Sequence, residues 1–267
     1  MDETEIKEMV RARYGSIAAA DGGADCCAPA AVGCCAPAPA DFRGTALAMG
    51  YSAAELAAVP EGANLGLGCG NPQAIADLRP GETVLDLGSG AGFDGFLAAR
   101  QVGPSGRVIG VDMTHEMLAK ARANAARIGA ANVEFRLGEL EHLPVADNTA
   151  DAVISNCVVN LVPDKAQVFR EAFRVLKPGG RLAVSDIIST APLPPELAAD
   201  PALLCGCIAG AAATDRIAGW LTAAGFAEIE ITLKPESRAL IASWAPGRGI
   251  ENHVASAVIK ARKPRRR

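Results

Sequence analysis

The chain has 267 residues, 50% of them hydrophobic, and a formal net charge of −4 at pH 7. This length is enough to bury a substantial core in one or two domains, and the acidic balance gives no reason to expect nucleic acid as a substrate. The sequence has no apolar run behind a basic start and no stretch of about 18 apolar residues, so we expect a soluble cytoplasmic protein with no membrane segment.

Apolar periodicity predicts the elements in chain order. Residues 2–18 have helical spacing and predict an amphipathic helix that covers the site, whereas residues 24–41, rich in Ala, Pro, Gly and Cys, predict no regular element. Strands and helices then alternate, with strands at 83–87, 107–111, 133–137, 150–155 and 180–186 and helices at 94–101, 116–128 and 165–175. The remaining predicted elements are a turn at 177–180, an insertion at 189–213, a helix capped by Thr214 or Asp215 that runs to about residue 224, and strands at 227–233 and 255–261.

A glycine-rich turn directly after the first predicted strand is the most informative segment. Gly88, Gly90 and Gly92 allow the backbone to turn tightly and to approach a ligand closely. Asp112 ends the next strand, where a carboxylate can bind the hydroxyls of a ribose. Asp86 lies two residues before the turn, and its charge would repel a pyrophosphate but attract an amino group or a sulfonium. The motif therefore predicts S-adenosylmethionine as the cofactor in preference to a dinucleotide.

The repeated alternation predicts an α/β fold with a Rossmann-like, doubly wound sheet of seven strands, the core of class I methyltransferases. We divide the chain into an N-terminal helix and Cys-rich flexible segment (1–60), a cofactor-binding domain (61–190), and a C-terminal region with the substrate-covering insertion and the last strands (191–267). In such a sheet, ligands bind at the carboxyl ends of the parallel strands. We expect a monomer, because no extra apolar helix or heptad pattern demands a partner.

The positions of the cysteines point to one edge of this sheet. Cys157 follows the fourth strand, Cys69 lies in a glycine-rich loop, and Cys205 and Cys207 lie in the insertion. In a reducing cytosol they persist as thiols, and thiolates favour soft, thiophilic centres, although packing is the ordinary role of a single buried cysteine. The spacing lacks the paired Cys-x-x-Cys of a zinc ribbon, and the histidines form no ligand pattern.

Three segments of the chain resemble the S-adenosylmethionine-dependent arsenite methyltransferases: residues 67–72, 86–92 and 155–165. The similarity runs across nearly the whole chain, including residues 110–114 and 236–247. Many methyltransferases share the glycine loop, whereas Asn-Cys-Val-Val-Asn-Leu-Val-Pro-Asp-Lys is a long and specific segment. The resemblance implies that arsenite, or a trivalent organoarsenical, is methylated for detoxification.

The resemblance also implies that three cysteine thiolates bind the arsenic and hold its lone pair toward the methyl group. The corresponding residues are Cys69, Cys157 and Cys207, because Cys207 begins the Cys-x-x-Gly-Ala pattern of the family, and Cys205 is extra. Thioredoxin or glutathione is the implied reductant. Since no histidine or carboxylate pair stands near any motif, we expect no general base.

Two vicinal cysteine pairs in the low-complexity segment resemble an N-terminal pair that captures arsenite in some members of the family. They are Cys26-Cys27 and Cys34-Cys35. These pairs either deliver the metalloid or only scavenge it, and the sequence leaves both roles open.

The expected cofactor contacts follow the strand ends: Asp86, Gly88, Ser89, Gly90, Asp112, Met113, Glu139 and Asn156. The glycine turn receives the methionyl part, Asp112 the ribose, and Met113 packs on the adenine. Glu139 either binds the adenine amino group or is an exposed loop acid. Asn156 either orients the sulfonium or caps the end of its strand.

Two other functions compete with arsenite methylation. One is a class I methyltransferase that acts on a small organic acceptor and uses its cysteines only for packing. The other is a nonenzymatic thiol protein that sequesters metalloid or heavy metal, against which the intact cofactor motif argues.

Overall fold

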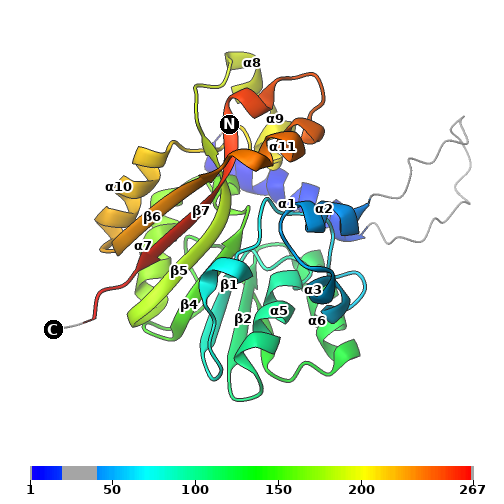
Figure 1. The fold of residues 1–267 in the computed structure, drawn as a ribbon, viewed down its shortest axis with the longest axis vertical. Helices are drawn as coiled ribbons and strands as arrows, with labels where there is room; N and C mark the ends of the chain where they lie inside the picture. Colours follow the sequence, from blue (N-terminus) through cyan, green and yellow to red (C-terminus); the bar gives the residue numbers. More distant parts are fainter. Residues whose placement is uncertain (1, 20–40, 266–267) are drawn as a thin grey trace, which may run out of the picture.

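The computed structural model describes residues 2–19 and 41–265, and seven strands form one sheet in the order β3-β2-β1-β4-β5-β7-β6 (Figure 1). The first five strands are parallel to one another: β1 (Thr83–Leu87), β2 (Arg107–Asp112), β3 (Val133–Leu137), β4 (Ala150–Asn156) and β5 (Leu176–Ser189). The antiparallel pair at the other edge is β6 (Ala227–Lys234) and β7 (Val254–Arg262). All seven predicted strands and the predicted α/β class are confirmed.

Strand β5 begins earlier than the sequence predicts. Leu176 pairs with Ala150 and Arg181 with Ala152, so the four residues between them bulge out of the ladder. Gly179 takes a left-handed conformation there, with φ +84°, and its N–H donates to the carbonyl of Lys263. The predicted turn at 177–180 is therefore a bulge within the strand, because Lys263 of the same chain supplies a backbone hydrogen-bond partner.

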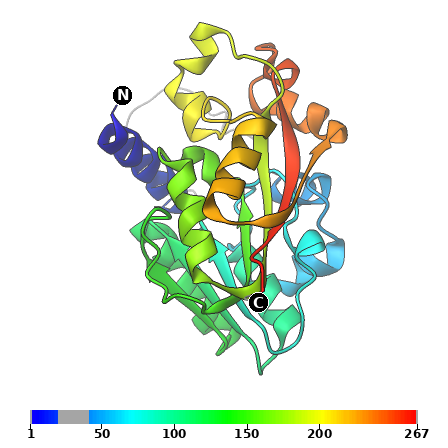
Figure 2. The same cartoon turned by 90° about the vertical axis from the view of Figure 1, so that its left-hand side faces the viewer.

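Helices cover both faces of the sheet. Helices α5 (Phe93–Val102) and α6 (His115–Ile128) lie on one face, and α7 (Lys165–Val175) and α10 (Thr214–Ala224) on the other (Figure 1). Figure 2 shows α7 and α10 side by side in front of the strands. The predicted cap of α10 is wrong: Ala213 is the N-cap and makes no side-chain bond, because its bridge to Ser189 fixes where the helix starts.

The remaining helices gather near the site or connect the layers: α1 (Glu3–Ala19), α2 (Phe42–Ala48), α3 (Ala53–Ala58), α4 (Gln73–Ala76), α8 (Pro195–Ala198), α9 (Pro201–Cys205), α11 (Arg238–Trp244) and the 3-10 turns η1 (Val159–Leu161), η2 (Pro235–Ser237) and η3 (Ile250–Asn252). Helices α1, α8, α9 and α11 lie at one end of the sheet (Figure 1). None of the helices within 2–19 and 41–265 has the length and apolar character needed to cross a membrane.

The core lies between the sheet and its two helical layers. Strand β1 is buried from Val84 to Leu87, and its Leu85 and Leu87 pack in one apolar cluster with Val168, Phe169 and Val175 of α7. Burial of each such side chain stabilises the fold by about 1.5–3 kcal/mol. The division of the chain at residue 190 stays a prediction, although β7 pairs with β5 across it within one continuous sheet.

Candidate functional site

A cavity of about 490 Å³ lies at the carboxyl ends of β1, β2 and β4, as the strand order predicts for a doubly wound sheet. Helix α1 contributes Val10 and Tyr14 to its wall, and α9 contributes Leu203. Most of the predicted site residues line it: Asp86, Gly88, Ser89, Gly90, Asp112, Met113, Asn156, Cys157 and Cys207. Cys69 lies behind this wall and is 3% exposed.

Asp86 has the properties expected of a cation-binding carboxylate. It is buried, and its Oδ2 has no hydrogen-bond partner among the described residues. Burial, followed by the charges of Asp94 and Asp112, raises the pKa of Asp86 well above its ordinary value. A ligand with a positive amino group or sulfonium would relieve both effects, because it supplies a donor and an opposite charge.

Asp112 shapes the glycine turn and remains available to a ligand. Its Oδ2 accepts from Gly90 N at 2.9 Å, and its Oδ1 accepts from Thr114 N at 2.8 Å. Each carboxylate oxygen keeps a second lone pair for a ribose hydroxyl. Together with the unpaired Oδ2 of Asp86, these acceptors fit the amino group and the ribose hydroxyls of S-adenosylmethionine.

Glu139 lies apart from the central cavity. It forms ion pairs with Lys7 at 2.7 Å and with Arg11 at 3.5 Å, both on α1, and it borders a shallow second pocket instead. Its neighbours Leu140 and Glu141 are the residues that reach the cavity. The structure thus favours the second of the two roles predicted for Glu139, a loop acid, which here fastens α1 to the sheet.

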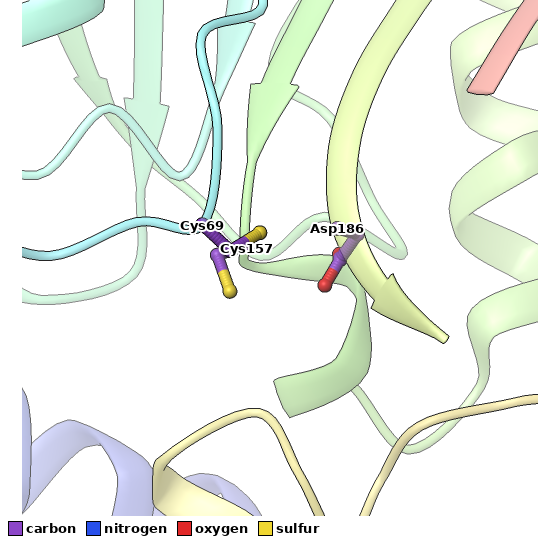
Figure 3. Close-up of side chains that lie close together, drawn as sticks. All are labelled: Cys69, Cys157 and Asp186. Carbon is purple, nitrogen blue, oxygen red and sulfur yellow. The ribbon is translucent and has the colours of Figure 1, made fainter. Parts of the chain in front are cut away.

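Two of the three predicted arsenic ligands, Cys69 and Cys157, lie close together, and the third, Cys207, contacts Cys157. The Sγ atoms of Cys69 and Cys157 and a carboxylate oxygen of Asp186 all lie within 4.8 Å of one another, although they belong to the loop before α4, the end of β4 and the last part of β5 (Figure 3). The thiol of Cys207 donates to the carbonyl of Cys157 at 2.8 Å. Cys205 is also buried, but burial alone raises its pKa, and Arg13 opposes that rise.

The thiols of the three cysteines influence one another. The hydrogen bond with Cys207 lowers the pKa of Cys157, but the bond with Cys69 and burial outweigh it, so this pKa is raised well above its ordinary value. The bond with Cys157, then burial, raises the pKa of Cys207, and burial raises that of Cys69. These thiols therefore stay protonated until a soft centre displaces the protons. Cys26, Cys27, Cys34 and Cys35 lie outside the described residues.

Comparison with known proteins shows the family to which this chain belongs. The family model described as a methyltransferase domain matches residues 78–225. An arsenite methyltransferase of Halobacterium salinarum is 53% identical over 269 residues, which cover 99% of this chain and 68% of the relative. The chain belongs to the arsenite methyltransferase family. The arsenite methyltransferase of Aquipseudomonas alcaligenes is 49% identical over 151 residues, which cover 54% of the chain but only 43% of that relative.

A solved structure agrees with this assignment. The arsenic(III) S-adenosylmethionine methyltransferase of Chlamydomonas reinhardtii has a TM-score of 0.59 and 33% identity to this chain, and the match covers 86% of this chain and 75% of the other. The fold and the cofactor-type cavity of this arsenite methyltransferase family member are thus those of a class I methyltransferase.

Two of the three cysteines have strained backbone. Cys157 has φ +57° and Cys207 has φ +62°, both in the left-handed region. For a residue with a Cβ atom this conformation costs about 1–2 kcal/mol, and it persists where surrounding structure imposes it, often at functional sites. The Cys157 N–H, which donates to the Ser185 carbonyl at 2.8 Å, and the Cys207 thiol provide such constraints.

We expect Cys207→Gly to be more stable than Cys207→Ala by about 1 kcal/mol, because only glycine is free of the left-handed strain. At a position with negative φ, the glycine variant is normally less stable than the alanine variant. Urea unfolding of both variants measures the difference. Cys69, whose φ is not positive, is the matched control, and there the alanine variant should be the more stable. Equal stability of the two Cys207 variants would show that the strain is absent.

Asn156 organises the loop that carries Cys69. Its Oδ1 accepts from Cys69 N at 3.1 Å, and its Nδ2 donates to Gly70 O at 2.9 Å. The same Nδ2 lies 3.0 Å from the hydroxyl of Tyr51 and 3.2 Å from Oδ2 of Asp94. Of the two roles predicted for Asn156, the structure favours structural capping at the strand end, although the side chain also lines the cavity.

Carboxylates do stand near the motifs, so the expectation that none would pair there is wrong. The charge of Asp94 acts on Asp86 and, after burial, raises the pKa of Asp86. Asp186 lies beside the thiols, and burial raises its pKa to about 7, opposed by N–H donors of Ile187 and Val159. Asp94 lies on the first turn of α5, directly after the glycine turn. That position in the sequence could have predicted that Asp94 lies at the site. Asp186 reaches the site only through the pairing of β5 with β4.

The titration of Asp94 should make stability depend on pH. Burial raises its pKa from 3.8 to about 6, although bonds from Tyr51 and Asn156 oppose the rise. As the pH increases, the unfolded chain loses this proton first, so the free energy of unfolding should fall between about pH 4 and pH 6. Urea unfolding across this range, in the parent chain and in Asp94→Asn, measures the slope. The variant should show a shallower fall, and an unchanged slope would contradict the assignment.

Proposed function

We propose that this chain transfers a methyl group from S-adenosylmethionine to trivalent arsenic held by the thiolates of Cys69, Cys157 and Cys207. The arsenic enters as arsenite or as a trivalent organoarsenical, and the methylated product serves detoxification. The observation that carries the proposal is that Cys69 lies close to Cys157, and Cys207 contacts Cys157, beside a cavity that Asp86 and Asp112 also line.

The binding step needs no external base. Each thiol proton combines with one hydroxyl of arsenous acid and leaves as water, while one As–O bond breaks and one As–S bond forms. Three such exchanges give arsenic bound by three sulfurs, with its lone pair on the opposite side. The raised pKa values of the thiols are compatible with this step, because the protons leave together with the hydroxyl groups.

We infer the position of the cofactor from the acidic residues and the glycine turn. When bound, S-adenosylmethionine supplies an electrophilic methyl group on a positively charged sulfur. Asp86 would hold its amino group, Asp112 its ribose and Met113 its adenine, while α1 covers the cavity through Val10 and Tyr14 and excludes water. Because the lone pair itself is the nucleophile, rate depends on alignment more than on proton transfer.

The reaction leaves the arsenic pentavalent, and return to the trivalent state needs two electrons. We propose that thioredoxin or glutathione supplies them, and that the protein works as a monomer in the cytoplasm, where thiols stay reduced. Gel filtration tests the monomer, and omission of the reductant tests the second part, since turnover should then stop after the first methylation.

The function is tested with methyl-labelled S-adenosylmethionine, arsenite and a thiol reductant. We expect label in methylated arsenic only when arsenite is present. If the chain binds the cofactor but methylates a small organic acceptor and never arsenic, the proposal fails and the competing methyltransferase function replaces it.

A further inference from the structure

Asp186 is a buried carboxylate that the proposed methyl transfer does not use. It is 2% exposed, and one of its oxygens stands within 4.8 Å of the Sγ atoms of Cys69 and Cys157. Figure 3 shows these three side chains side by side, although they come from three separate segments. The site thus contains a mixed set of two sulfurs and one oxygen.

The carboxylate is held in place and keeps room for a ligand. Its Oδ1 accepts from Ile187 N at 2.7 Å and from Nδ2 of Asn160 at 2.9 Å, while its Oδ2 accepts from Val159 N at 3.0 Å. A carboxylate oxygen has two lone pairs, so Oδ2 retains one. The side chain can therefore bind a cation without losing its backbone partners.

The donor set is typical of a tetrahedral divalent cation. Zinc binds thiolates at about 2.3 Å and carboxylates at about 2.0–2.2 Å, which places its donors about 3.5–3.8 Å apart. The three donor atoms of this site lie at most 4.8 Å apart, so they need to move closer together by at most about 1 Å to bind such an ion. Two thiolates exclude magnesium and calcium, which prefer oxygen ligands.

Charge also suits a dication. Two thiolates and one carboxylate leave a complex with a net charge of −1, and the positive charge of Lys165 acts on Asp186. Arsenic bound by three thiolates is neutral and gains nothing from a carboxylate. We propose that Cys69, Cys157 and Asp186 form a binding site for a thiophilic divalent cation of the zinc and cadmium class, occupied in competition with arsenic.

This site goes beyond the proposed methyl transfer but shares two thiols with it. The two sites differ in the third donor, which is Asp186 for the dication and Cys207 for arsenic. No zinc-ribbon spacing is visible in the sequence, because the ligands come from the loop before α4, the end of β4 and the last part of β5, which only the folded sheet brings together.

The test uses the full chain with Cys26, Cys27, Cys34 and Cys35 replaced by Ser, so that only the cavity thiols remain alongside Cys205. The protein is reduced with a phosphine, freed of metal, and titrated with Cd²⁺ alone by equilibrium dialysis and thiolate-to-cadmium absorbance. Arsenite binding is titrated separately, without cofactor. We expect one Cd²⁺ per chain, displaced by arsenite in equal amount.

Two variants should separate the ligand sets. Asp186→Asn should lower Cd²⁺ affinity at least about 10-fold and leave arsenite affinity nearly unchanged. Cys207→Ser should lower arsenite affinity at least about 10-fold and leave Cd²⁺ affinity nearly unchanged. Cys205→Ser is the matched thiol control and should change neither. The retained arsenite binding of Asp186→Asn shows that this variant is folded.

Each outcome decides one of the two proposals. Cd²⁺ binding that arsenite does not displace, or that Asp186→Asn leaves intact, overturns the cation site. Loss of Cd²⁺ binding in Cys207→Ser also overturns it, even if Asp186→Asn fails to fold. Arsenite binding that is unaffected in Cys207→Ser overturns the arsenic ligands of the proposed function and leaves the cation site standing.

Discussion

Cys207→Ser is expected to lower kcat/KM for arsenite at least about 100-fold while leaving S-adenosylmethionine binding intact. A serine hydroxyl is a hard ligand and replaces the third sulfur poorly, so the arsenic is no longer held with its lone pair toward the cofactor side. Mutation of a residue that only hydrogen-bonds to a metal ligand typically lowers metal affinity or activity about 10–100-fold. Cys207 is proposed as a ligand itself, so its loss should cost at least as much. Methyl transfer from labelled cofactor and equilibrium binding of the cofactor measure the two parts.

Cys205→Ser is the matched control, two residues away in the same insertion. Its thiol takes no part in the hydrogen bonds that join Cys207 to Cys157, so methylation should be nearly unchanged. The opposite pattern, with Cys205→Ser inactive and Cys207→Ser active, would exchange the two residues in the proposed ligand set.

Asn156→Ala is expected to cost about 3 kcal/mol of unfolding free energy and to lower methylation at least about 10-fold. The substitution leaves the N–H of Cys69 and the Oδ2 of Asp94 without this partner, and each buried unsatisfied group costs about 1–3 kcal/mol. The loop that presents Cys69 also loses its tether to β4. Urea unfolding and the rate of arsenite methylation at saturating cofactor measure the two effects.

Ser256→Ala is the control, because it removes another side-chain hydrogen bond to the backbone of Cys69. Ser256 Oγ donates to the carbonyl of Cys69 at 2.7 Å. Loss of this single neutral hydrogen bond should cost about 1 kcal/mol. If the two substitutions lower the free energy of unfolding equally, the hydrogen bonds of Asn156 stabilise the loop no more than a single ordinary hydrogen bond does, and the prediction is wrong.

Local patterns predicted most of the secondary structure. The bounds of β1, β3 and α7 agree with those expected from apolar periodicity, since burial on one side of an element repeats along the sequence. The errors fall where a distant segment supplies the backbone partner. The carbonyl of Lys263 accepts from the bulge of β5, and the bridge from Ser189 to the N-cap Ala213 fixes where α10 starts.

The sequence by itself determined the glycine turn, Asp86 before it, Asp112 at the end of the next strand, and the segment around Cys157, because each belongs to a short, contiguous motif. Only the tertiary structure decided that Asp186 joins the thiols, that Asn156 ties the Cys69 loop to β4, and that Glu139 faces α1. These contacts join residues far apart in the chain, so they depend on strand order and on how the loops close, which no local periodicity records.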